Sequence, residues 1–184
     1  ITINCSGPWF DKLNSTGHAS INTSTTISPT RIQVGHKELT DDEDFLGLPF
    51  VADCYGASGI YFMPRRANKQ LVFGSVDHRF ESEIVDPDDF NDQLDPDVKT
   101  DYLSCLMHRL PGLPASGNIT GFSHLYSVNQ DDVHPIIGAA PGMDNYFVVN
   151  GFSGHGFKLA PAVGSLVQQQ ILGKSSSEGL GHTS

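Results

Sequence analysis

The sequence predicts an α+β fold in which a mixed, largely antiparallel sheet is flanked by helices. Short apolar runs recur along the chain between turn residues, as is typical of strands. A basic turn at residues 64–69 joins two of these runs as a hairpin. Two longer segments repeat apolar residues every three or four positions, which is the spacing of a helix with one buried face.

The composition is that of a globular, loop-rich protein. The chain has 184 residues, of which 38% are hydrophobic and 17% are charged. Its formal net charge of −10 argues against a nucleic-acid partner, because phosphate contacts need clustered Lys and Arg. A small anionic substrate remains compatible with this charge, since only the local field of a pocket matters. No apolar run approaches the ~18 residues of a membrane span, so no span is expected.

The cysteines indicate a reducing compartment. Cys5, Cys54 and Cys105 form an odd set without C-x-x-C spacing. The N-terminus also lacks the basic flank and apolar core of a secretion signal. We therefore expect buried thiols and a cytoplasmic protein.

The elements follow one another in a simple order. Residues 14–30 are expected to be a polar connection, and Asp41–Asp44 an exposed acidic loop. Helices are expected from Pro96 to about Leu110 and from Phe157 to Leu172. The expected strands are Ile1–Cys5, Arg31–Val34, Pro49–Ala52, Gly59–Met63, Gln70–Gly74, Ile119–Val128 and Tyr146–Val149.

No metal site is predicted. The aspartates of residues 41–44 and 86–97 lack the alternate spacing of a calcium loop. None of the eight histidines pair at H-x-H or H-x-x-x-H spacing, and there is no Cys-His cluster.

The stretch from Asn150 to Lys158 carries the clearest functional pattern. An apolar strand, a turn containing Gly151, Gly154 and Gly156, and the start of a helix follow one another directly. Glycines allow positive φ and close approach, and the free N–H groups of a first helical turn face an anion or an electron-rich group. Lys158 lies at the positive end of the helix dipole, where a negative partner would explain it; the alternative is a lysine that extends into water.

Residues 151–158, followed by Ala160-Pro161-Ala162-Val163-Gly164, resemble the C-terminal signature of the FAD-dependent amine and amino-acid oxidoreductases. This D-amino-acid oxidase superfamily includes sarcosine and glycine oxidases, and the sarcosine-oxidase-like branch is the nearest match. Ser6-Gly7-Pro8-Trp9 is similar to the point where the family's FAD-binding domain meets its substrate-binding domain. The resemblance implies an oxidoreductase that converts a secondary amine or amino acid (sarcosine- or glycine-like) to an imine by hydride transfer to flavin.

The resemblance also implies roles for individual residues. His155 and Lys158 would be catalytic, with Lys158 pairing with the substrate carboxylate. Tyr61, His124, Tyr126 and Lys158 would bind substrate, although a core position for Tyr61 stays open. The implied FAD-binding residues are Gly7, Trp9, Gly151, Phe152, Ser153, Gly154, His155, Gly156, Phe157 and Lys158.

No G-x-G-x-x-G motif occurs in the sequence, so the chain is interpreted as the C-terminal portion of a longer flavoprotein, inactive as an isolated fragment. Residues 1–30 would be the end of the FAD-binding domain and a connection, and residues 31–138 the substrate-binding domain. Residues 139–174 would form a return strand and a helix that caps the flavin. Residues 175–184 would be a flexible tail.

Some features of the chemistry stay open. Sarcosine-type enzymes place a flavin-linking cysteine near His124 and an oxygen-activating lysine near Val72, and neither residue type is present there. Non-covalent FAD and a dehydrogenase are therefore favoured, with an electron-acceptor protein or O2 as the oxidant; a shift of register would bring Lys69 into the lysine's place. The alternative function is a non-catalytic accessory or interaction subunit that keeps the fold without binding FAD.

Overall fold

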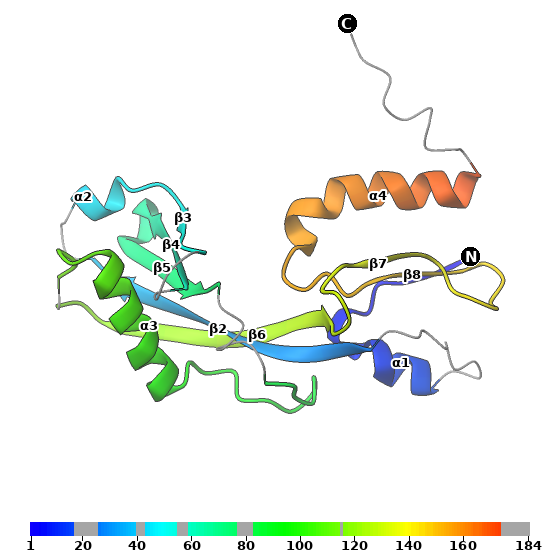
Figure 1. Ribbon diagram of the computed structural model, residues 1–184, viewed down its shortest axis with the longest axis horizontal. Coiled ribbons are helices and arrows are strands. Elements are labelled where there is room, and N and C mark those ends of the chain that lie inside the picture. Colours follow the sequence, from blue (N-terminus) through cyan, green and yellow to red (C-terminus); the bar gives the residue numbers. More distant parts are fainter. Residues whose placement is uncertain (17–25, 40–42, 55–58, 77–82, 115, 174–184) are drawn as a thin grey trace, which may run out of the picture. The chain divides into compact units, whose positions relative to one another are not determined.

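The computed structural model describes residues 1–16, 26–39, 43–54, 59–76, 83–114 and 116–173 (Figure 1). The chain forms two compact units. We call residues 1–29 and 126–184 the terminal unit, and residues 30–125 the central unit. The predicted tail at 175–184 lies outside the described residues.

The terminal unit contains a three-stranded mixed sheet. Its strands are β1 (Thr2–Asn4), β8 (Tyr146–Asn150) and β7 (Ile136–Ala139), in the order β1-β8-β7. β1 runs parallel to β8, and β7 runs antiparallel to it. A parallel pair cannot be joined by a tight turn, and here the paired residues are more than 140 positions apart in the sequence.

Helices accompany this sheet on both sides. The 3₁₀ helix η1 (Gly7–Trp9) leads into α1 (Phe10–Thr16), and Phe10 packs with Ile27, Ala140 and Val148 in a small core. The neighbouring Val149 points to the opposite face, because successive side chains of a strand alternate. There it faces α4 (Gly156–Leu172), which lies along β7 and β8 (Figure 1).

The central unit is built on a five-stranded sheet in the order β3-β4-β5-β2-β6. β4 and β5 form a hairpin through the 3₁₀ helix η2 (Arg66–Asn68) and Lys69, whose φ is 49°. β2 and β6 are the long strands by which the chain enters and leaves this unit. The strands are β2 (Ile27–Glu38), β3 (Val51–Ala52), β4 (Ile60–Arg65), β5 (Gln70–Ser75) and β6 (Ile119–Asn129).

One face of the central sheet carries the larger core. Helix α3 (Pro96–Arg109) begins at Pro96, whose fixed φ and missing N–H suit a first helical position. Its buried residues Tyr102 and Leu106 are four apart and therefore share one face. They pack against β4 and β5, beside the short helix α2 (Glu43–Leu46). The buried cluster consists of Leu39, Ile60, Phe62, Leu71, Phe73, Tyr102, Leu106 and Leu113.

The α+β class with antiparallel strands and flanking helices is confirmed, but the strands form two sheets rather than one. β2 begins at Ile27, inside the stretch expected to be a polar connection, because Ile27 is buried in the terminal core. Glu43 and Asp44 start a helix instead of continuing a loop. Cys5 and Cys54 are exposed, so the expectation of buried thiols is wrong for them. Within the described ranges, no helix is both long and apolar enough to cross a bilayer.

Candidate functional site

The predicted glycine turn lies between β8 and α4 of the terminal unit. Its backbone adopts positive φ at Gly151 (72°), Ser153 (48°) and Gly154 (82°). Residues with a side chain rarely adopt positive φ, which explains the glycines at positions 151 and 154. Ser153 adopts positive φ despite its side chain, at some cost in backbone strain. The turn reverses the chain between Asn150 and the first helical residue, Gly156.

The end of β6 holds this turn in place. The backbone N–H of Ser153 donates to the carbonyl of Ser127 at 2.9 Å. The Ser153 hydroxyl accepts a hydrogen bond from the backbone N–H of Asn129 at 3.2 Å and donates to the carbonyl of Gly151 at 3.2 Å. A β-bridge between Val128 and Phe152 adds to this attachment. Ser153 therefore has a structural reason to be a serine despite its positive φ.

Tyr126 packs directly against the turn. A Cβ atom placed on Gly154 would lie 2.5 Å from Cε2 of the Tyr126 ring, far inside van der Waals contact. A residue predicted to bind substrate thus touches one predicted to bind the cofactor. Only glycine fits at this position, both for its φ and for the space that the ring leaves.

Asn150 connects the turn to the N-terminal segment. Its side chain is 1% exposed; the amide Nδ2 donates to the carbonyl of Gly7 at 3.1 Å, and Oδ1 accepts from the N–H of Gly151 at 2.8 Å. Gly7 has φ 57° and open space where a side chain would stand. Two segments that the resemblance assigned to FAD binding therefore meet through one buried amide.

Several N–H groups at the start of α4 are left open. The N–H of His155 is used, because it donates to the carbonyl of Phe152 at 2.8 Å. Across the described ranges of the chain, no acceptor is found for the N–H groups of Gly154, Gly156 or Phe157. These groups lie at the positive end of the dipole of a helix that runs from Gly156 to Leu172.

A cavity of about 510 Å³ borders the same turn. It lies within the terminal unit, between β1, β8 and α4, and its lining is mainly apolar. His155 and Lys158 are exposed and are not among the lining residues. The lining consists of Ile3, Cys5, Gly7, Ser127, Val149, Asn150, Phe152, Gly156, Phe157, Ala160, Val163, Gly164 and Val167.

The other predicted site residues lie elsewhere in the chain. Trp9 belongs to η1 and is 41% exposed. Tyr61 belongs to the central unit, where its ring lies 6.1 Å from that of Phe50. His124, also in the central unit, is exposed and its Nδ1 accepts from the N–H of Leu125 at 3.1 Å.

Sequence reasoning placed Asn150 at the start of the functional stretch without giving it a role, and it missed Asn129. Asn129 is 4% exposed, and its Nδ2 donates to Oδ1 of Asp132 at 2.8 Å and to the carbonyl of His134 at 2.7 Å. The available signal was the position of each asparagine at the end of an apolar strand. A buried amide must find hydrogen-bond partners, so such a residue marks a place where other segments converge.

The comparison with known families decides the identity of the fold. A family model described as "DAO: FAD dependent oxidoreductase" matches residues 1–170. The chain belongs to this family. The resemblance found in the glycine turn is thereby confirmed, and the matched range includes both units.

Individual known proteins resemble this chain to different extents. L-saccharopine oxidase from Schizosaccharomyces pombe is 28% identical over 178 residues, which cover 88% of this chain and 40% of that protein. N-methyl-L-tryptophan oxidase from Salmonella dublin is 42% identical over 72 residues, which cover 39% of this chain and 18% of that protein. The crystal structure of L-proline dehydrogenase from P. horikoshii shares the fold with a TM-score of 0.75 at 23% identity, covering 96% of this chain and 44% of that one. The chain thus spans less than half the length of each.

Proposed function

We propose that this chain forms the flavin-capping and substrate-binding portion of an FAD-dependent oxidoreductase that oxidises a secondary amine or amino acid to an imine. The observation that carries the proposal is the set of open N–H groups of Gly154, Gly156 and Phe157 beside an apolar cavity. Membership of an FAD-dependent family supports the choice of cofactor.

The residues around the turn fit a flavin. An isoalloxazine ring is flat and largely apolar, with polar atoms along one edge. The cavity offers apolar lining from α4 and β8, and the start of α4 offers unpaired donors. Gly7 leaves open space where any other residue would place a side chain. We expect non-covalent binding, because the sequence has no cysteine near His124, where the family resemblance places the flavin-linking cysteine.

FAD, when bound, supplies the acceptor for the hydride that leaves the carbon next to the amine. The chain supplies fixed donors: the N–H groups at the start of α4 and the helix dipole stabilise negative charge without reorganisation. Ser153, Tyr126 and Asn150 keep these donors in place through the contacts described above. His155 completes the turn, since its Nδ1 lies 3.0 Å from the carbonyl of Ser153.

We infer an N-alkylated amino acid as the substrate class. The names of two relatives contain L-saccharopine and N-methyl-L-tryptophan, and both molecules carry a secondary amine next to a carboxylate. Lys158, in the first turn of α4, is proposed to pair with that carboxylate. This assignment rests on the position of Lys158 and on the family resemblance, since the side chain does not line the cavity of the terminal unit.

We propose further that the enzyme is a dehydrogenase. Val72 stands where an oxygen-activating lysine was expected, and its cross-strand neighbours are Met63 on β4 and His36 on β2. Burial, together with the charge of Arg65, lowers the pKa of His36 below its ordinary value of 6.5, which favours the neutral ring at pH 7. Val72 therefore has no cation among these neighbours. Lys69 lies three residues earlier, in the hairpin turn.

The decisive experiment is optical. The full-length protein should purify with the visible absorption of oxidised flavin, and anaerobic N-methyl amino acid or L-proline should bleach it. Readmitted O2 should restore the colour slowly, and an artificial electron acceptor quickly. A colourless protein would favour the non-catalytic subunit instead. Rapid recovery in O2 would contradict the dehydrogenase assignment alone.

A further inference from the structure

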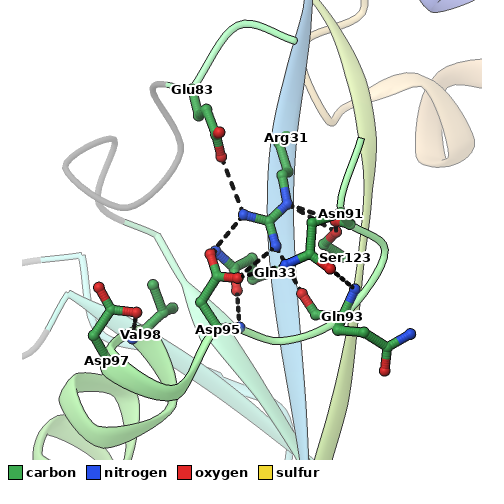
Figure 2. A network of polar contacts seen from close by, with 9 residues as sticks. All are labelled: Arg31, Gln33, Glu83, Asn91, Gln93, Asp95, Asp97, Val98 and Ser123. Atoms are coloured by element: carbon green, nitrogen blue, oxygen red, sulfur yellow. Dashed lines mark hydrogen bonds and ion pairs between the residues drawn. The ribbon is translucent and has the colours of Figure 1, made fainter. Parts of the chain in front are cut away.

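A buried arginine lies at the centre of a polar network in the central unit. Arg31, on β2, is 4% exposed and its guanidinium is surrounded by acceptors (Figure 2). Both of its terminal nitrogens bond to the carboxylate of Asp95, at 2.6 and 3.0 Å, and Nη1 also pairs with Glu83 at 3.1 Å. Arg31 also donates to the backbone carbonyls of Asn91 and Gln93, each at 2.7 Å.

These acceptors lie on one segment, residues 83–95, which we call the strap. At one end the strap pairs with β2, through a bridge between Ile84 and Thr30 and a 2.8 Å bond from the N–H of Arg31 to the carbonyl of Glu83. At the other end it pairs with β6, through a bridge between Gln93 and Phe122. Arg31 thus bonds to the strap along its whole length, from Glu83 to Asp95.

The strap is hydrogen-bonded to β6 at Ser123. The backbone N–H of this residue donates to the carbonyl of Asp92 at 2.7 Å. Its hydroxyl donates to the carbonyl of Asn91 and accepts from Nε of Arg31 at 3.0 Å. Ser123 is 3% exposed, so these bonds are shielded from competing water. The backbone N–H and the hydroxyl of Ser123 are therefore both held by Arg31 and the strap.

The residues on either side of Ser123 point to the other face of the sheet, since side chains alternate along a strand. Phe122 does so, because its ring meets that of His36 on β2 at 5.5 Å, whereas Arg31 and Ser123 lie together on the face that carries the strap. His124, a candidate substrate-binding residue, shares the Phe122 face by the same alternation. The hydrogen bonds to Ser123 on one face of the sheet therefore also fix the directions in which the side chains of Phe122 and His124 point on the other face.

We propose that Arg31 is a positioning residue that acts through the strap and Ser123 to hold Phe122 and His124 in place for substrate binding. The proposal rests on the proposed function in one respect only, namely that this face of β6 meets the substrate. The five N–H donors of a buried guanidinium need acceptors. Arg31 finds them on two parts of the chain at once, the strap and the hydroxyl of Ser123 on β6.

The first test measures, without reference to activity, how firmly Arg31 and the strap hold β6 around Ser123. Hydrogen exchange of the full-length protein should be compared for Arg31→Lys, Ser123→Ala and Asp97→Asn. Asp97 is the matched control, because its carboxylate lies beside the network in Figure 2 but, among the described residues, accepts a hydrogen bond only from the N–H of Val98, at 3.0 Å. In the first two variants we expect exchange at the amides of residues 121–125 to accelerate roughly 10-fold or more through local opening. Unchanged exchange in both variants would refute the proposal that Arg31 and the strap hold β6 in place.

The second test asks whether the hydrogen bonds that hold Ser123 are needed for substrate binding. With L-proline and N-methyl amino acids as substrates, Arg31→Lys and Ser123→Ala should raise KM roughly 2- to 30-fold and change kcat little. Asp97→Asn should match the wild type. Ser123→Ala keeps the buried ion pair, so it remains informative if the arginine variant folds poorly. Accelerated exchange with unchanged KM would overturn the positioning role. A wild type that oxidises no amine would refute the proposed function instead. The exchange data would still show whether Arg31 and the strap hold β6 in place.

Discussion

At the scale of single residues, the ion pair of Arg31 and Asp95 makes the central unit sensitive to acid. The hydrogen bond from Arg31 holds the pKa of Asp95 below its ordinary value of 3.8, against the opposing effect of burial. A carboxyl group with a lowered pKa stabilises the fold above the pKa of the unfolded chain. That contribution is complete above pH 3.8 and disappears as the pH falls from 3.8 through the lowered value.

We therefore predict that Arg31→Met makes the free energy of unfolding depend less on pH in the acid range. The free energy of unfolding should fall at neutral pH by about 3–5 kcal/mol, the usual cost of leaving one charge of a buried pair alone. Below pH 3.8 the difference from the wild type should shrink, because Asp95 becomes neutral in both proteins. Urea unfolding at a series of pH values measures this. A constant difference at all pH values would contradict the linkage.

Lys158 gives a prediction that belongs to the proposed reaction. Replacing it with methionine removes the charge but keeps the length of the side chain. For a substrate with a carboxylate, KM should rise by the equivalent of ~1.5–3 kcal/mol, the value of a charged hydrogen bond. Steady-state kinetics of the full-length enzyme provide the measurement.

Two controls accompany this variant. Lys158→Arg should retain most of the affinity, since it keeps the positive charge. A secondary amine without a carboxylate should show the same KM in Lys158→Met and in the wild type. If the carboxylate-bearing substrate also kept its KM, the assignment of Lys158 would be wrong.

At the scale of elements, the turn between β8 and α4 depends on the absence of a side chain at Gly154. Gly154→Ala combines an unfavourable φ of 82° with a 2.5 Å approach to the Tyr126 ring. We predict a loss of about 1–3 kcal/mol in the free energy of unfolding, together with weaker flavin retention because the donors of the turn shift. Thermal unfolding and the flavin-to-protein absorbance ratio measure the two effects.

Gly138 in β7 provides the matched control within the same unit. A Cβ atom there would meet nothing within 4 Å, and the backbone φ is not positive. Gly138→Ala should leave stability unchanged or raise it by up to about 1 kcal/mol, since glycine loses more backbone entropy on folding. Equal losses in the two variants would mean that the Tyr126 contact is unimportant.

At the scale of the whole molecule, cofactor and fold should stabilise each other. A ligand that binds only the folded state adds RT ln(1 + [L]/Kd) to its stability, about 2.7 kcal/mol when the ligand is present at 100 times Kd. Removal of FAD from the full-length protein should therefore lower Tm, and added FAD should restore it in a concentration-dependent way. Differential scanning fluorimetry measures this shift. A Tm that does not respond to FAD would argue for the non-catalytic alternative.

Several elements were predictable because their signals are local. The hairpin of β4 and β5 is marked by two short apolar runs on either side of a basic turn. Helix α3 is marked by Pro96 at its start and by apolar side chains at helical spacing. The strand, turn and helix around Gly154 were read from a single continuous stretch. In each case, residues close in sequence decide the backbone conformation.

The long-range arrangement was not predictable in this way. The parallel pairing of β1 with β8 and the bond from Asn150 to Gly7 each join residues more than 140 positions apart. The contacts of Arg31 depend on the strap, 52–64 residues further along the chain. No periodicity in the sequence records such pairings, because they arise only when separate elements pack together.

The sequence by itself determined the class of the fold, its main helices and strands, and a glycine turn distinctive enough to indicate an FAD-dependent family. Only the tertiary structure decided that the strands form two sheets and that a buried amide links Gly7 to this turn. It also brought the ring of Tyr126 against Gly154. The physical reason is that conformational preference is a property of neighbouring residues, whereas burial and hydrogen-bond satisfaction belong to the folded chain as a whole.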